Sequence, residues 1–525
     1  MMFTRKRAAI VATIAAAAIT LAGCSGSDSE ETTAPTTGAA TSDGAMAAPE
    51  GTLTLGTLVP VTTFEAANAA WANESPYMQA VYDTILRADP DGTIVAGLAT
   101  DWSWDDTNTV LTMTLRDDVV FTDGNPVDAD AAAQSILRFQ GGTSPQASSL
   151  RFVEDATAVD AQTLQITLSA PDPALTTMLT QNAGMVESPA AFDSADIATN
   201  PVGSGPYTFN AEESVVGDSY VFDVKADYWK PEDQYYEKIV MKVFSDATAM
   251  LNAIQSGQIN GAKLADNTTI PQIEGAGWDI VSGELNWAGL LLTDRDGALT
   301  PALGDVRVRQ AINYALDRDG LLQAAAAGYG TVTEQIFPTF STSFDESLDA
   351  TYTYDVEKAK QLMADAGYAD GFDLTIPYTP AFGATIFPIV EQQLGEIGIT
   401  VELDEIAVTD YISGILGQKY SAAFMQLQQD PSDWQIAQFQ IVAAAAWNPF
   451  NIEDPKVEEL AGVLQTGTPE EAEAAGKELN AYLVDQAWNA PLYRNQSTFV
   501  TDANTDAQFQ VVNAYPYLWT IKPTN

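Results

Sequence analysis

The sequence predicts a mixed α/β fold, because strand patterns and helix patterns follow one another along the chain. Apolar and polar residues alternate over positions 111–115 and again over 163–168, which is the period of half-buried strands. Between these segments, Asp128 stands where a helix N-cap is expected, and the apolar residues Ala132 and Ile136 then share one helical face.

The second half of the chain continues the same mixture. Asp305 precedes a helix with a single apolar stripe, and Asp355 precedes another helix that Gly367 is expected to end. A third amphipathic helix turns at Gly398 into a strand over 399–403, where apolar residues alternate with polar ones. A helix that leads into a short strand is typical of α/β units.

Residues 1–24 indicate a lipoprotein signal peptide. Basic residues at 5–7 precede an apolar run over 8–22, and Cys24, the only cysteine of the 525 residues, follows Gly23. A lipid on Cys24 would anchor the exported protein on the extracytoplasmic face of the cell membrane. The alternative is a signal-anchor helix, but the run is shorter than the roughly 20 apolar residues that a membrane crossing needs.

The segment after the cysteine differs in composition from the rest of the chain. Residues 25–50 are Ser, Thr, Ala, Gly, Pro and acidic residues with almost nothing large enough to bury, which predicts a disordered tether. Because no second cysteine exists, the exported domain has no disulfide and depends on a large apolar core.

Composition excludes several classes of function. The chain has 23 basic and 71 acidic residues, a balance that disfavours nucleic acid as a partner. It has no histidine, which removes the commonest transition-metal ligand and the usual general base of Ser-His-Asp and Cys-His catalysis. We therefore expect no metal site. Adjacent acids such as Asp105 and Asp106 are expected to be solvated turn residues rather than a catalytic pair.

Several segments resemble one known family, the extracellular solute-binding proteins of family 5, the peptide/nickel type that serve ATP-binding cassette (ABC) importers. The resemblance covers most of the mature chain. It is carried by five segments: YDTILRADPDGTIVAGLATDWSWDD at 82–106, LTMTLRDDVVFTDGNPVDADAAAQSILRF at 111–139, GSGPYTF at 203–209, VRVRQAINYALDRDGL at 306–321, and YDVEKAKQLMADAGYADGF at 354–372.

The resemblance implies a two-lobed, periplasmic-binding-protein-like type II fold with an additional α/β domain. By analogy with the family, lobe I combines residues 50–84, 201–285 and 492–525, the additional domain covers 85–200, and lobe II covers 286–491. The chain then crosses between the lobes twice, and we expect hinges near Ser282–Leu290 and Trp488–Tyr493, where few contacts resist rotation.

The resemblance also implies a receptor rather than an enzyme. We expect a monomer that binds oligopeptides or another small polar solute in a cleft between the lobes and delivers it to the ABC permease subunits by hinge closure. This role requires no catalytic residue, metal or cofactor. An oligosaccharide or a metal chelate is the alternative solute, and a cell-surface glycoside hydrolase or an adhesin is the alternative class of protein.

The expected ligand-binding residues lie in lobe II. Peptide binders of this family have an aspartate, shortly before an acid-Pro pair, that meets the amino group of the ligand. In this chain the acid-Pro pair is Asp430 and Pro431, and only Met, Gln and Leu stand upstream, so Asp430 or Asp433 is expected to take that role, unless no amine is bound. The tryptophans near the expected cleft either cover the ligand or pack in the core; they are Trp287, Trp434 and Trp447.

Overall fold

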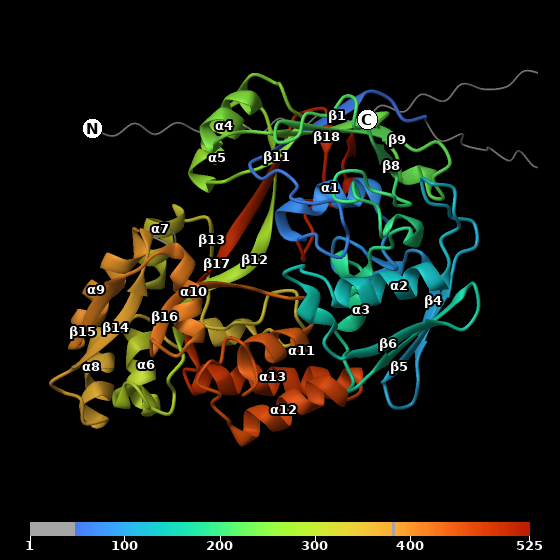
Figure 1. The fold of residues 1–525 in the computed structure, drawn as a ribbon. Coiled ribbons are helices and arrows are strands. Elements are labelled where there is room, and N and C mark those ends of the chain that lie inside the picture. Colours follow the sequence, from blue (N-terminus) through green and yellow to red (C-terminus); the bar gives the residue numbers. More distant parts are fainter. Residues whose placement is uncertain (1–47, 381–383, 525) are drawn as a thin grey trace, which may run out of the picture. The chain divides into compact units, whose positions relative to one another are not determined.

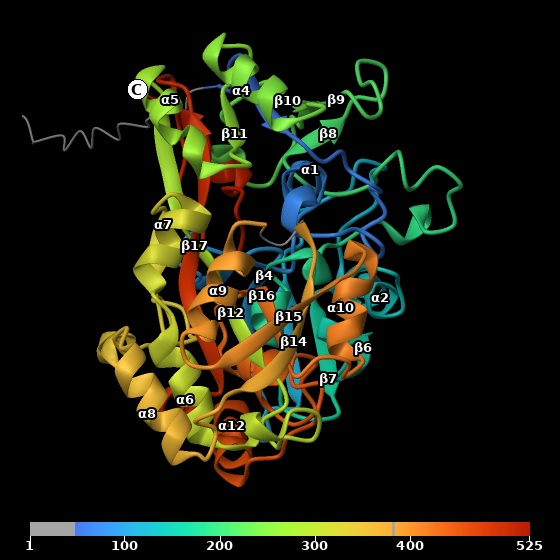
Figure 2. The same cartoon turned by 90° about the vertical axis from the view of Figure 1, so that its left-hand side faces the viewer.

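A nine-stranded mixed sheet connects distant parts of the chain in the computed structural model, which describes residues 48–380 and 384–524 (Figure 1). Its longest strands, β12 (Asp279–Leu292) and β17 (Asn489–Thr501), run antiparallel and side by side (Figures 1 and 2). β12 also pairs with β16 (Ala422–Gln428). Beyond β17 the sheet continues, in spatial order, with β11 (Gly261–Lys263), β1 (Thr52–Thr57), β10 (Lys238–Val243), β9 (Ser219–Val224) and β8 (Tyr207–Phe209), while β13 (Gly330–Val332) pairs with β17.

The two halves of β12 have different surroundings. Its second half, residues 287–292, is entirely buried and pairs with both β16 and β17, as expected for a nearly continuous apolar run. Its first half, residues 279–284, is largely half-buried and pairs with β17. The register between β12 and β17 shifts after Glu284 and again after Ala288, so the long ladder is irregular between its two halves.

A second, antiparallel sheet has the order β4 (Ala99–Trp104), β5 (Val110–Leu115), β7 (Thr163–Leu168) and β6 (Val153–Ala158). The strands predicted at 111–115 and 163–168 are confirmed, and their apolar residues are the buried ones. Helix α2 (Ala129–Gln140) packs on β6 and β7. The Asp128 carboxylate accepts a hydrogen bond from the backbone N–H of Ala131 at 2.9 Å, which confirms the predicted cap.

The helices predicted in the second half are also confirmed. Asp305 and Asp355 cap α6 (Val306–Ala315) and α8 (Val356–Asp365) through their side chains. Gly367, after α8, has a φ of 88°, a left-handed conformation that favours glycine. Helix α9 (Ile386–Gly395) leads through Gly398 into β15 (Ile399–Glu405), which pairs in parallel with β14 (Phe372–Tyr378). The mixed α/β class is therefore confirmed.

Further elements complete the fold of the described residues. The other helices are α1 (Ser75–Val81), α3 (Leu175–Met178), α4 (Ala247–Gln255), α5 (Ile270–Gly275), α7 (Arg318–Ala326), α10 (Val408–Leu416), α11 (Asp433–Ile436), α12 (Pro455–Thr466) and α13 (Pro469–Asp485). Two short strand pairs are β2 (Leu86–Ala88) with β3 (Ile94–Ala96), and β18 (Thr505–Asp506) with β19 (Lys522–Pro523).

One apolar cluster extends from the four-stranded sheet to the region after β16. It contains Leu111 and Leu164 of that sheet together with Leu427, Trp434 and Leu460. A second cluster lies among α6, α8 and α9, and a third surrounds β1 and α1. The four-stranded sheet and the 427–460 region, far apart in sequence, therefore share buried surface in this structure.

The predicted signal peptide, its lipid acceptor Cys24 and the tether up to residue 47 lie outside the described residues. Among the residues that are described, no helix combines the length and the apolarity of a bilayer-crossing segment. The same residues contain no group of acidic side chains gathered as metal ligands.

Candidate functional site

A cavity of about 680 Å³ lies between the large sheet, the region of the four-stranded sheet and the chain after β16. Its size falls within the range of about 300–1,000 Å³ that is common for ligand pockets. Most of its wall comes from residues 71–73, 145–183, 263–267 and 426–447, together with residues of β12 and β17. Segments distant in sequence therefore meet around this partly open cavity.

Strand β16 presents a polar face to this cavity. Gln426 and Gln428 are exposed and line it, whereas the alternating residues Met425 and Leu427 are buried in the core. This alternation follows from the two-residue period of a strand. The chain then places Asp430 at the same cavity, two residues beyond the end of β16.

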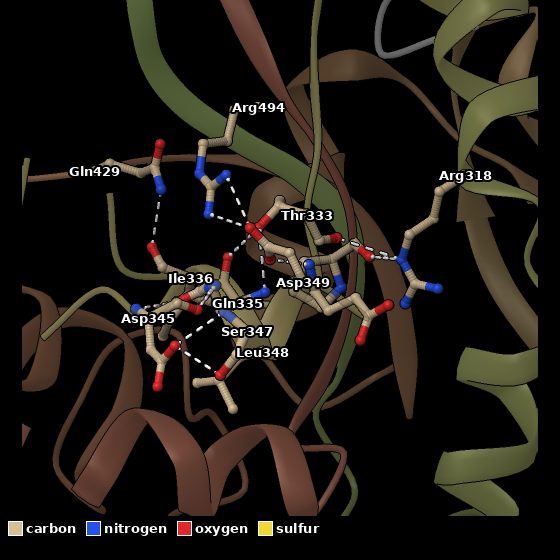
Figure 3. Close-up of polar contacts among 12 residues, drawn as sticks. Arg318, Thr333, Gln335, Ile336, Asp345, Ser347, Leu348, Asp349, Gln429 and Arg494 are labelled. Atoms are coloured by element: carbon tan, nitrogen blue, oxygen red, sulfur yellow. Dashed lines mark hydrogen bonds and ion pairs between the residues drawn. The ribbon is translucent and has the colours of Figure 1, made fainter. Parts of the chain in front are cut away.

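Gln429, the residue before Asp430, donates hydrogen bonds to two other segments of the chain. The backbone N–H of Gln429 donates to the carbonyl of Leu285 at 2.8 Å, and its side-chain amide donates to the carbonyl of Ile336 at 3.0 Å (Figure 3). These bonds attach the end of β16 to β12 and to the segment around Ile336. Asp430 therefore stands on a fixed backbone.

The segment around Ile336, which accepts the side-chain hydrogen bond of Gln429, is in turn held in place by contacts of Asp349. The Asp349 carboxylate accepts hydrogen bonds from the Thr333 hydroxyl at 2.8 Å and from the backbone N–H of Glu334 at 2.9 Å. It also forms an ion pair with the buried guanidinium of Arg494 on β17, at 3.4 Å (Figure 3). This network ties residues 333–349 to the strand that borders the cavity.

Asp430 is a buried carboxylate of the cavity wall. The residue is 8% exposed, and none of the described residues donates a hydrogen bond to its side chain or forms an ion pair with it. Burial alone raises the pKa of Asp430 to about 7. A buried charge requires compensation, so this side chain can bind a cationic group of a ligand.

Two basic side chains line the cavity wall. Lys263 has no acidic partner among the described residues, whereas the Asp172 carboxylate acts electrostatically on Arg151. Lys263, at the end of β11, donates to the side-chain oxygen of Asn73 at 3.3 Å, and burial lowers its pKa. Arg151, which follows the segment 147–150, lies 4.9 Å from the ring centre of Phe152. The cavity therefore offers positive as well as negative charge.

Aromatic side chains cover another part of the cavity. Phe439, 45% exposed, and the half-buried Trp447 both line it, and the backbone N–H of Trp447 donates to the carbonyl of Phe439 at 3.1 Å. The next residue, Asn448, is fully buried and accepts a hydrogen bond from Arg295 at 2.7 Å. The two aromatic rings are thus presented on an anchored turn.

The predicted ligand-binding residues fall into two groups, those that line the cavity and those that contact other parts of the protein. Asp430 and Trp447 line the cavity. Trp287 is fully buried, and its indole N–H donates to the Gln440 side chain at 3.0 Å. Trp434 is buried in the apolar cluster, and the Asp433 carboxylate accepts hydrogen bonds from the hydroxyls of Ser341 and Ser343. These three side chains contact protein rather than the cavity.

Other residues of the cavity wall were not predicted from the sequence. Lys263 and Arg151 come from segments that carry no recognisable motif. The glutamines of the cavity wall did leave a signal, because the stretch from 426 to 440 is rich in this residue. Of these glutamines, Gln426, Gln428, Gln435, Gln438 and Gln440 line the cavity.

The long antiparallel strands β12 and β17 both contribute residues to the wall of this cavity. The family model of the bacterial extracellular solute-binding proteins, family 5 (middle), matches residues 93–448. The chain belongs to this family, as its motifs predicted. The members are extracytoplasmic substrate receptors of ABC importers and not enzymes, so the predicted class of protein is confirmed.

Individual relatives support the same assignment. The chain is 26% identical over 431 residues to the glutathione-binding protein GsiB of Salmonella paratyphi A, which covers 76% of this chain and 80% of that protein. Among solved structures, HbpA2 of Haemophilus parasuis has a TM-score of 0.79 at 20% identity, over 90% of this chain and all of that chain. DppA of Helicobacter pylori in complex with the peptide STSA has a TM-score of 0.71 at 20% identity, over 91% and 99% of the two chains. The predicted two-lobed fold is confirmed by these likenesses.

Proposed function

We propose that this chain is a lipid-anchored, monomeric receptor that binds a small peptide in the cavity and delivers it to the permease of an ABC importer. The observation that carries the peptide assignment is Asp430, a buried carboxylate at the cavity wall that has no partner among residues 48–380 and 384–524. The ammonium group of a peptide supplies the missing charge. The name of the GsiB relatives, glutathione-binding protein, supports a peptide of this size.

Closure of two lobes about β12 and β17 is the proposed means of delivery. The lobe boundaries follow the family: 50–84, 201–285 and 492–525 for lobe I, 85–200 for the additional domain, and 286–491 for lobe II. The register shifts of β12 at 284–286 and 288–289 lie at the crossing between lobes and support hinges there and in the paired part of β17. A solute that contacts both lobes favours the closed form by the difference in its affinity for the two forms.

The peptide assignment is tested by calorimetry on protein that has been stripped of solute by unfolding and refolding. The probes are glutathione and a mixture of random tripeptides, each with a free amine or with the amine acetylated. We expect one solute per protein and a loss of affinity of about tenfold or more on acetylation, since a charge-assisted hydrogen bond contributes about 1.5–3 kcal/mol.

Two matched variants test whether Asp430 causes the loss of affinity on acetylation. Asp430→Asn keeps the shape of the side chain and should bind free and acetylated probes alike. Asp266→Asn changes another carboxylate of the wall, but one that already accepts hydrogen bonds from Thr268 at 2.8 and 2.6 Å, so it should behave as the wild type. Equal binding of both probe forms by the wild type would contradict the role of Asp430.

A second candidate solute is an oligosaccharide. The exposed ring of Phe439 and the ring of Trp447 on the cavity wall favour it, because aromatic faces stack on sugar rings. Binding of oligosaccharides, with no binding of any free peptide in the same calorimetric series, would select this alternative.

A further inference from the structure

A buried arginine lies at the boundary between the proposed lobes. Arg494 of β17 is 1% exposed and pairs with Trp287 of β12, between the two register shifts of that ladder. A guanidinium always carries its charge and has N–H donors on several sides, so a buried one requires acceptors around it. Any movement at this boundary that changes the acceptors of Arg494 therefore changes the free energy of the protein.

The acceptors of Arg494 in this structure are few. Both of its terminal nitrogens lie 3.4 Å from the same oxygen, Oδ2 of Asp349 (Figure 3). This distance is longer than the roughly 2.7–2.9 Å of a charge-assisted hydrogen bond. The Nε–H is buried and forms no hydrogen bond with any residue that the structure describes. The ion pair with Asp349 therefore leaves part of the hydrogen-bonding capacity of Arg494 unused.

A second carboxylate, that of Glu284 on β12, lies near the same guanidinium. Glu284 pairs with Gln496 across the ladder, and Gln496 shares a sheet face with Arg494, two residues earlier. Glu284 and Arg494 form no ion pair here, but Arg494 acts on the carboxylate electrostatically. Burial raises the pKa of Glu284, against favourable contacts with Thr331 and Arg494. A closer approach of the guanidinium would therefore stabilise this carboxylate.

The two carboxylates belong to different proposed lobes. Glu284 is near the end of the lobe I segment 201–285, and Arg494 is near the start of the lobe I segment 492–525, whereas Asp349 belongs to lobe II. Rotation of lobe II about the proposed hinges moves Asp349 relative to Arg494 and leaves Glu284 on the same lobe as Arg494. The ion pair with Asp349 is therefore the one that opening breaks.

Starting from the proposed closure of the receptor, we propose that Arg494 exchanges carboxylates at the hinge: it pairs with Asp349 when the lobes are closed and with Glu284 when they are open. Without a replacement for Asp349, opening would leave a buried charge unpaired, which is strongly unfavourable. Glu284 therefore stabilises the open form, and Asp349 stabilises the closed form. The balance between the two ion pairs sets the closed fraction of the solute-free receptor, and with it the apparent affinity for solute.

Two substitutions remove the competing partners one at a time. Glu284→Gln should favour the closed form and raise the affinity for glutathione or the tripeptide mixture about threefold, whereas Asp349→Asn should lower it by a similar factor. Asparagine retains the Oδ1 that accepts hydrogen bonds from Thr333 and Glu334, and replaces only the oxygen that faces the guanidinium. Calorimetry on the full mature chain measures both effects.

Two further variants show whether Glu284 acts through Arg494. In an Arg494→Gln background, Glu284→Gln should have no effect, because the shared partner is gone. Glu274→Gln is the matched control, since Glu274 is an exposed carboxylate of α5 that forms no ion pair with any described residue, and it should bind as the wild type. An affinity of Glu284→Gln equal to or below that of the wild type would overturn the exchange, whether or not the Arg494 variant folds.

A distance measured in solute-free protein separates this inference from the proposed peptide binding. Because Cys24 is the only cysteine, Cys24→Ala permits spin labels at two introduced cysteines, Gln134→Cys on α2 and Glu459→Cys on α12, both at exposed positions. Pulsed electron paramagnetic resonance should give a shorter mean distance with Glu284→Gln than without it, and a longer one with Asp349→Asn. Distances that neither substitution changes would overturn the exchange, even in a receptor that binds peptides. The expected changes in a protein that binds no probe would contradict the peptide assignment alone.

Discussion

The side-chain amide of Gln465, on α12, donates a hydrogen bond to the backbone carbonyl of Pro171, 2.9 Å away and 294 positions earlier in the chain. Pro171 belongs to the region of the four-stranded sheet, and Gln465 belongs to the proposed lobe II. The two regions also share an apolar cluster, which includes Leu464, the residue before Gln465. Under the proposed mechanism, opening of the lobes breaks both interactions, so they contribute to the stability of the closed form.

The first prediction concerns Gln465. Replacement by alanine removes one hydrogen bond, which contributes about 0.5–1.5 kcal/mol, so we expect solute affinity to fall between about twofold and tenfold. Calorimetry with the tripeptide mixture measures this effect. Gln361→Ala is the matched control, because Gln361 bonds to Asp365 of its own helix. Affinities that do not differ between the two variants would contradict a role of the Gln465 contact in closure.

The second prediction is that the free energy of unfolding depends on pH through the ionisation of Asp430. Its pKa of about 7 in the folded, ligand-free protein exceeds the value of about 3.9 expected in an unfolded chain. The folded state then holds a proton that the unfolded state has lost, so the free energy of unfolding falls as the pH rises from about 4 to about 7.

Asp430→Asn removes this titration, and the variant should gain stability over the wild type as the pH rises. One pKa unit corresponds to about 1.4 kcal/mol, so the gain at pH 8 should exceed the gain at pH 5 by on the order of 2 kcal/mol. Urea unfolding of both solute-free proteins at the two pH values measures it. A gain that is the same at pH 5 and pH 8 would contradict the raised pKa.

The third prediction separates two tryptophans. Trp447 lines the cavity, and its replacement by alanine should weaken solute binding by about 1–3 kcal/mol with little effect on folding. Trp434 is buried in the core, and its replacement should lower the free energy of unfolding by about 3–5 kcal/mol. Calorimetry and denaturant unfolding distinguish these outcomes. If Trp434→Ala folds stably but no longer binds solute, Trp434 contacts the solute and its assignment to the core is contradicted.

The fourth prediction concerns the proposed lipid anchor. Cys24→Ala should release the protein into the medium and leave solute affinity unchanged, because the tether separates the anchor from the cavity. Fractionation of cells and medium, followed by calorimetry on the released protein, provides the measurement. Membrane association that persists in the variant would refute the lipid at Cys24.

Local patterns predicted most of the secondary structure. The strands at 111–115 and 163–168 and the caps Asp128, Asp305 and Asp355 depend on neighbouring residues, and a pattern in sequence suffices for them. The family and its two-lobed fold followed from longer motifs. The packing of the four-stranded sheet against the 427–460 region had no local signal, since it depends on contacts between distant segments.

The site was predictable only in part for the same reason. Asp430 was found because its acid-Pro pair is a local motif. The sequence did not distinguish Trp447, which lines the cavity, from Trp434, because the chain between them contains a π-helical segment, Ala437–Ile441, that no local pattern predicted. Lys263 was missed because β11 has three residues and reaches the cavity through its pairing with β1 and β17.

Small-angle X-ray scattering tests the central claim, reversible closure around a small peptide, most directly. Stripped protein should have a larger radius of gyration than protein with the free tripeptide mixture or glutathione, and dialysis should restore the larger value. Asp430→Asn should require a higher concentration of the same probes for the same contraction. Identical scattering of stripped and solute-loaded wild-type protein, with occupancy verified by native mass spectrometry, would contradict the account.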